Sequence, residues 1–158
     1  MKYHVNYKVW VYQSNRLLTS KEISEINESL KNFTATWKAH GQDLSAGYEI
    51  RYGLFIILWL NENVTSASGC SIDSSVRLMK EIEQKYGVEL FNRFNIAWKV
   101  GDEIKIANRE EFKKLVSNGD IKNETIVFNN MVSNGADLTR KWEVPFSESW
   151  HAKVFSTT

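Results

Sequence analysis

The sequence predicts an α+β fold in which helices cover a mixed β-sheet. Near the start of the chain apolar residues alternate with polar ones, and in two later segments they recur at spacings of three and four. The resulting order, β-α-β-α-β-β-α with an irregular aromatic tail, favours a mixed sheet because strand-helix-strand units tend to close as right-handed crossovers. With 158 residues, 42% of them hydrophobic, and no linker or repeat, we expect a single domain over residues 1–158.

The first two elements are a strand over 3–12 and a helix over 20–39. Alternation of polar and apolar residues predicts the strand. Thr19 and Glu22 have the spacing of a capping box, and Gly41 is a natural left-handed stop for the helix. One stripe of this helix is expected to face the sheet, and it consists of Ile23, Ile26, Leu30, Phe33 and Trp37.

A long segment over 48–60 predicts one strand that becomes central in the sheet, because its second half is apolar on both faces. A loop of small polar residues follows and leads into a second helix, which is expected to end at Gly87. The apolar stripe of this helix consists of Ile72, Val76, Met79, Ile82 and Tyr86.

The second half of the chain begins with a hairpin, whose strands over 94–100 and 103–106 flank a Gly-Asp pair. Asn108 is then placed to cap a short helix. Beyond that helix we expect a short strand over 125–128 and one helical turn over 136–140.

The tail over 142–155 is rich in aromatic residues but has neither helical nor strand period. Such a segment either packs back across the domain or forms part of a ligand pocket. Both alternatives stay open for Trp142, Phe146 and Trp150.

The segment 68–73 places the only cysteine, Cys70, at the start of the second helix. Free amides at a helix start stabilise a thiolate or bind an anion. One hypothesis is therefore a thiol enzyme in which Cys70 attacks an electrophile, His40 acts as the base and Asp73 or Asp43 orients that base. The structural alternative is that Ser71 or Asp73 caps the helix. In that case Cys70 is a small buried residue and His40 complements the dipole of the first helix.

A second hypothesis is a binding module for a small polar ligand or a protein partner. Its contacts would come from the start of the second helix and from aromatic residues near it, namely Trp37, Ser68, Gly69, Ser71, Trp142, Trp150 and His151. We favour the binding module, because a thiol enzyme needs a reactive cysteine with a base beside it whereas a module needs only a pocket.

Several functions are excluded by what the sequence lacks. It contains neither G-x-x-x-x-G-K-[ST] nor G-x-G-x-x-G, so we expect no P-loop ATPase and no cofactor. One cysteine and three histidines exclude a Cys-rich zinc site, and we expect no metal, although His40 or His151 could join carboxylates in one. The net charge of +1 predicts no nucleic-acid partner.

Location is predicted from the apolar runs. The start of the chain has no uninterrupted apolar core of the kind found in signal peptides, and the longest apolar run, Leu54 to Leu60, is too short to cross a bilayer. We therefore expect a cytoplasmic protein without membrane insertion. Its oligomeric state is not predicted.

Five segments together carry a resemblance, and they are 9–13, 37–41, 68–73, 142–146 and 149–152. Through them the chain, from about Lys8 to Phe155, resembles an uncharacterised family of small bacterial proteins often labelled "ABC transporter ATPase". That label implies ATP binding and hydrolysis, which the missing Walker A motif contradicts. The resemblance brings no catalytic residue or mechanism to this chain.

Overall fold

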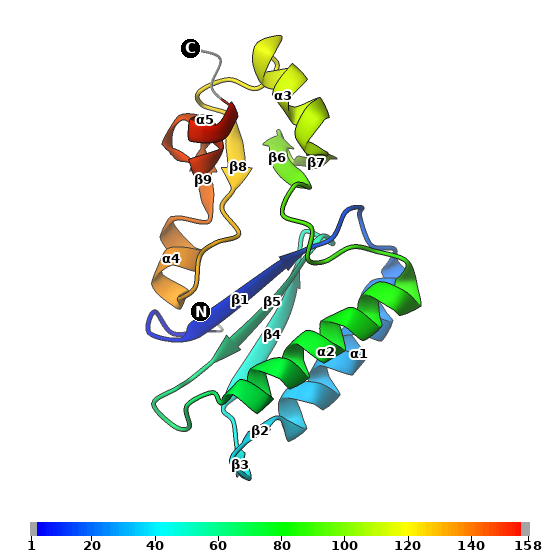
Figure 1. The fold of residues 1–158 in the computed structure, drawn as a ribbon, viewed down its shortest axis with the longest axis vertical. Helices are drawn as coiled ribbons and strands as arrows, with labels where there is room; N and C mark the ends of the chain where they lie inside the picture. Colours follow the sequence, from blue (N-terminus) through cyan, green and yellow to red (C-terminus); the bar gives the residue numbers. More distant parts are fainter. Residues whose placement is uncertain (1–2, 156–158) are drawn as a thin grey trace.

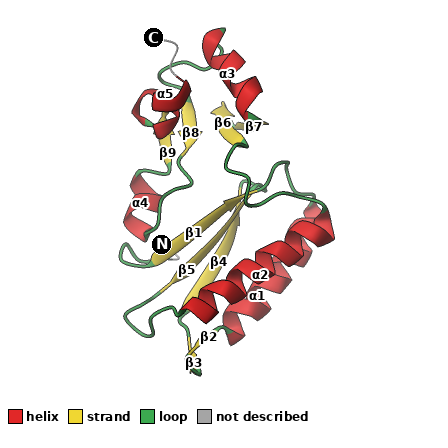
Figure 2. Cartoon of the chain, viewed as in Figure 1, coloured by secondary structure: helices red, strands yellow, loops and turns green. Residues whose placement is uncertain are grey.

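The computed structural model describes residues 3–155, which form an α+β fold of helices and antiparallel sheets (Figures 1 and 2). The predicted fold class is confirmed. The strands form three antiparallel sheets, however, and not the one mixed sheet that we expected; their orders are β1-β5-β4, β2-β3 and β7-β6-β8-β9. Hairpins and antiparallel pairings take the place of parallel crossovers.

The first sheet contains β1 (Lys8–Gln13), β4 (Ala46–Arg51) and β5 (Phe55–Leu60). The single strand expected over 48–60 is a hairpin, because Tyr52 and Gly53 take left-handed backbone angles, with φ of 58° and 61°, and reverse the chain. Its second half, β5, is the central strand as predicted, and every residue of β5 is buried.

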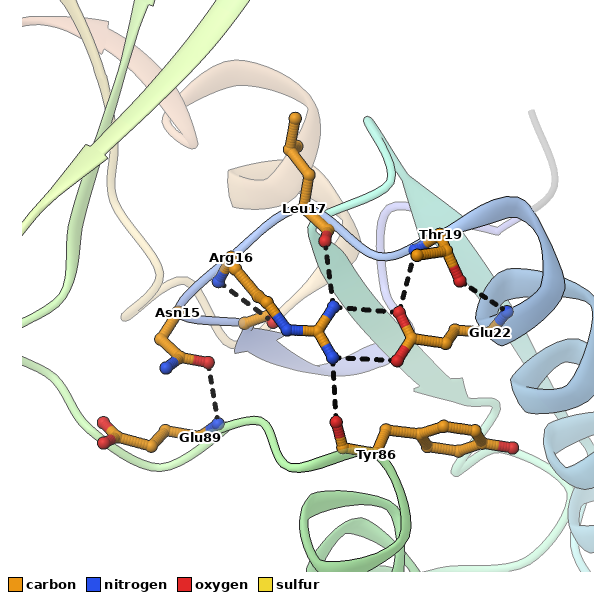
Figure 3. Close-up of polar contacts among 8 residues, drawn as sticks. Asn15, Arg16, Leu17, Thr19, Glu22, Tyr86 and Glu89 are labelled. Atoms are coloured by element: carbon orange, nitrogen blue, oxygen red, sulfur yellow. Dashed lines mark hydrogen bonds and ion pairs between the residues drawn. The ribbon is translucent and has the colours of Figure 1, made fainter.

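Helix α1 (Ser20–Thr36) begins at the predicted capping box, in which Thr19 and Glu22 bond each other's backbone amides. Arg16 donates two hydrogen bonds to the Glu22 carboxylate and a third to the carbonyl of Tyr86, so the start of α1 is joined to the end of the second helix (Figure 3). The predicted stripe is confirmed at its centre, where Ile26 and Leu30 are fully buried.

Helix α1 ends three residues before the predicted boundary. Trp37 adopts an extended conformation, and the chain then forms the short hairpin of β2 (Lys38–Ala39) and β3 (Gln42–Asp43). Gly41 is left-handed as expected, but it turns this hairpin and does not end the helix.

Helix α2 (Gly69–Tyr86) is capped by Ser68 and ends at the left-handed Gly87, as predicted for its C-terminus. Both long helices cover one face of the first sheet (Figure 1). A shared core of Leu30, Ile56, Leu58 and Met79 lies between them and the strands.

The second sheet confirms the predicted hairpin, Asn108 cap and short elements. It is built from β6 (Ile96–Val100), β7 (Glu103–Ala107), β8 (Ile126–Phe128) and β9 (Glu143–Pro145), with helices α3 (Arg109–Ser117) and α4 (Gly135–Arg140) between them. The tail is not irregular: β9 is followed by a 3-10 turn and by α5 (Trp150–Phe155). Its aromatic side chains belong to the core, since Trp142 and Phe146 are buried.

The two sheets meet through a common apolar core. Val9 and Phe55 of the first sheet share a cluster with Ala97 and Phe128 of the second. The far face of the second sheet packs against α3 and α5 around Phe112. No helix within residues 3–155 is long and apolar enough to cross a membrane.

Candidate functional site

The loop at 68–73 is closed on itself as a capping box. The Ser68 hydroxyl accepts from the Ser71 amide at 3.1 Å, and the Ser71 hydroxyl accepts from the Ser68 amide at 2.7 Å. The predicted cap at Ser71 or Asp73 is therefore wrong in its residue, because the N-cap is Ser68. Ser71 is the N3 partner of this capping box, and its hydroxyl bonds the Ser68 amide. Gly69 and Cys70 lie exposed in the first turn, so the expectation of a buried cysteine is wrong.

Among the predicted residues outside this loop, Trp37 forms a hydrogen bond to it. Its buried Nε1 donates to the carbonyl of Ser71 at 2.8 Å. His40 is exposed in the turn between β2 and β3, with a left-handed φ of 53°, and Asp73 is exposed on α2. Within residues 3–155 no hydrogen bond or ion pair joins His40 or Asp73 to Cys70. Of the remaining three predicted residues, Trp150 and His151 belong to α5, which lies far from the start of α2 (Figure 1), and Trp142 lies in the core between the two sheets.

A cleft of about 650 Å³ lies between the two sheets. One wall is strand β1, and the opposite wall is the segment 90–97, which connects the end of α2 to β6. Phe128, the loop 130–133, Trp150 and His151 complete the lining. Two of the predicted ligand contacts therefore share a concave site, although the helix start at 68–73 is not part of it.

Strand β1 presents an unpaired edge to this cleft. In an antiparallel pair, alternate residues direct their N–H and C=O groups to opposite sides. Ser14 bonds the β5 side through its N–H, whereas the N–H of Val9 bonds outward to the carbonyl of Ser133 at 3.0 Å. The backbone N–H and C=O groups of Val11 and Gln13 consequently point away from β5, as the N–H of Val9 does. The described part of the chain provides no backbone partner for Val11.

A chain of side-chain amides runs along the lining of the cleft. Buried Gln13 donates through Nε2 to the carbonyl of Asn95 at 2.8 Å and accepts through Oε1 from Asn130 at 2.8 Å. Asn130 in turn accepts from the indole of Trp142 at 2.9 Å. The predicted residue Trp142 thus lies outside the lining of the cleft, and its hydrogen bond holds the lining residue Asn130.

His151 and Trp150 form a stacked pair with ring centroids 3.8 Å apart. His151 is only 2% exposed, and burial lowers its pKa to about 4, so the imidazole is neutral near pH 7. Within residues 3–155, Nδ1 of His151 and Nε1 of Trp150 have no hydrogen-bond partner. Buried polar groups are usually satisfied, but both nitrogens are themselves buried and are not exposed to the open cleft.

The lining also contains exposed apolar side chains and two basic ones, among neutral polar residues. Phe94 and Met131 are 57% and 67% exposed, which is unusual for side chains of their size. Lys8 and Arg93 line the same cleft, and no carboxylate does so within the described residues. The cleft therefore suits an apolar ligand that carries negative charge.

Sequence reasoning missed these cleft residues. They come from three segments far apart in the chain, and only the run over 90–95, with two exposed phenylalanines beside asparagines and an arginine, was an available signal.

Sequence reasoning also missed a second cluster, at the hairpin turn between β4 and β5. The Tyr52 hydroxyl donates to Glu143 at 2.9 Å and accepts from Lys99 at 3.2 Å. Lys99 also forms an ion pair with Glu143, which raises the pKa of the lysine. The three groups bond one another, and the cluster joins the first sheet to the second.

No group of three or more histidine, cysteine or carboxylate side chains within residues 3–155 is arranged to hold a metal ion. Comparison with known proteins yields no matching family model, no matching curated protein and no matching solved structure. The resemblance to small bacterial proteins accordingly stays a prediction.

Proposed function

We propose that this protein is a binding module whose ligand lies in the cleft between β1 and the segment 90–97. The observation that carries the proposal is the combination of the exposed apolar side chains of Phe94 and Met131 with the basic side chains of Lys8 and Arg93 around one concavity. Protein ligand sites are typically concave and apolar, with a few polar groups that fix orientation. The location differs from the predicted loop at 68–73, whose serines already bond each other.

The ligand class follows from the charges of the lining. Lys8 and Arg93 favour an anionic group, and Phe94 with Met131 favours an apolar one. We further propose a cytoplasmic location, because an exposed and unpaired Cys70 persists most readily in a reducing compartment.

A dye that is both apolar and anionic tests this proposal. Titration with anilinonaphthalene sulfonate should show one saturable site on the native chain. Arg93→Glu and Phe94→Ser should each weaken binding about ten-fold, which corresponds to ~1.4 kcal/mol. The matched control is Val64→Ser, which removes an equally exposed apolar side chain outside the cleft and should leave binding unchanged. Binding that is absent, or that all three variants weaken equally, would contradict a site in the cleft.

The thiol enzyme is a second candidate, favoured by the exposure of Cys70 in the first turn of α2. In that mechanism His40 removes the proton from the Cys70 thiol, and the thiolate attacks an electrophile. Alkylation of the native protein by iodoacetamide at neutral pH separates the two candidates. A thiol enzyme requires a marked loss of rate in His40→Ala, whereas the binding module predicts equal rates for both proteins.

A further inference from the structure

We propose that the occupant of the cleft is an extended, acidic segment of a partner protein, which adds to the free edge of β1 as a further strand. This inference rests on the proposed function of the cleft and names the chemical class of its ligand. Strand addition of this kind draws its affinity from main-chain hydrogen bonds and its specificity from the side chains around them.

The edge of β1 offers a short and well-defined set of main-chain groups. The carbonyl of Val9, both groups of Val11 and the N–H of Gln13 point away from β5 and toward the cleft. They span about 13 Å, the length of a strand of about five residues. An added strand can therefore make two to four hydrogen bonds with β1.

The chain itself starts a strand on this edge and then leaves it. Gly135 donates to the carbonyl of Tyr7 at 2.9 Å, and Asn134 forms an isolated antiparallel bridge with Lys8. Continued pairing would bring Met131 opposite Val11. The chain instead turns over 129–132, where Met131 is exposed, and the place beside Val11 is left to the cleft.

The surroundings of this vacant place define the partner segment. Phe94 and Met131 offer apolar contacts to side chains on one face of an added strand. Lys8 and Arg93 are the charged side chains in the described lining, so acidic residues in the segment gain favourable interactions. Unpaired edges are normally covered or protected by charge, and here the edge is open inside a cleft, where only a slender extended chain can reach it.

The test uses a fluorescein-labelled hexapeptide that alternates glutamate and valine, with fluorescence anisotropy as the readout. A strand that adds to β1 directs only alternate N–H groups toward it. Two methylated peptides are compared, one N-methylated at the valines and the other at the glutamates. One of them should bind at least ten-fold more weakly than the parent peptide, and the other should bind within about three-fold of it. A peptide that alternates lysine and valine should bind at least ten-fold more weakly than the glutamate peptide.

On the protein, Val11→Pro removes the outward N–H without removing a hydrogen bond to β5, because proline is tolerated where a strand N–H faces outward. It should lower the affinity at least ten-fold. The matched control is Ala46→Pro on β4, the opposite edge strand, where alternation also directs the N–H away from β5. This control should bind as the parent protein does. If Val11→Pro fails to fold by circular dichroism, the methylated peptides still decide the question, since they leave the protein unchanged.

Equal effects of the two methylation patterns would overturn strand addition, and so would binding that Val11→Pro leaves intact. A dimer in sedimentation that Val11→Pro abolishes would also overturn it, because a second copy would then cover the edge. Loss of strand addition while the dye still binds in the cleft would leave the proposed function standing. Absence of both dye and peptide binding would overturn both proposals.

Discussion

His151 is a histidine that the fold keeps neutral. The ring is enclosed by its stacked neighbour Trp150 and by Phe112, and burial lowers its pKa from 6.5 to about 4. Between these values the unfolded chain binds a proton that the folded chain does not. The free energy of unfolding should therefore fall as the pH is lowered from about 6.5 to about 4, by at most about 3 kcal/mol.

Urea unfolding across this pH range measures the effect. In His151→Gln the fall between about pH 6.5 and pH 4.5 should disappear. Glu22 serves as an internal control, because Arg16 lowers the pKa of that carboxyl from 4.5 to about 2. Its stabilising contribution is present above about pH 4.5 and is lost as the pH falls toward 2, which lies below the window used for His151. An unchanged slope in His151→Gln would show that another group titrates there.

Substitutions in helix α1 and its cap compare how much a capping residue and a core residue contribute to the free energy of unfolding. Thr19→Ala removes the hydroxyl that accepts from the Glu22 amide and should lower the free energy of unfolding by about 1 kcal/mol. Leu30→Ala leaves a cavity among fully buried side chains and should cost about 2 to 5 kcal/mol. Lys31→Ala, on the exposed face, is the control. If Leu30→Ala and Lys31→Ala had the same denaturant midpoint, the burial of this stripe would be contradicted.

Elements are predicted well where the signal lies within a few residues along the chain, as a cap, a stop or an apolar stripe does. The caps at Thr19 and Asn108, the stop at Gly87 and the apolar stripe through Leu30 are all confirmed. The turn at Tyr52 was missed because a bulky residue is rare in the left-handed region. Contacts from Phe55, Phe128 and Trp142, with the hydrogen bonds to Lys99 and Glu143, accompany this conformation, and such long-range partners leave no periodic trace.

Over the whole molecule, the candidate site escaped prediction because the topology creates it. The cleft exists only where β1, the segment 90–97 and the loop 130–133 converge. Sequence reasoning selected Trp150 and His151 through their aromatic character, and it placed them beside a helix start at 68–73 that lies elsewhere. Spacing along a chain indicates which face of an element a residue occupies, but it does not indicate which elements meet.

The predicted single domain is testable through the cooperativity of unfolding. Val9 and Phe55 of the first sheet share a core with Phe128 of the second. The side-chain amide of Gln13 also bonds Asn95 and Asn130, which lie in the segments that lead to and from the second sheet. Two sheets joined in this way should unfold together. Leu30→Ala, in the core under α1, and Phe112→Ala, in the core under α3, are substitutions at opposite ends of the molecule.

Each of these two substitutions should lower the protection of the slowest-exchanging amides in both β5 and β6 by the same free energy, about 2 to 5 kcal/mol for each variant. Hydrogen exchange followed by mass spectrometry measures both strands in one sample. The reason is that, in a cooperative unit, the amides of either sheet exchange only when the whole chain opens. If Leu30→Ala weakened protection in β5 while β6 kept that of the parent protein, the chain would consist of two domains, and the cleft between the sheets would be a boundary between them.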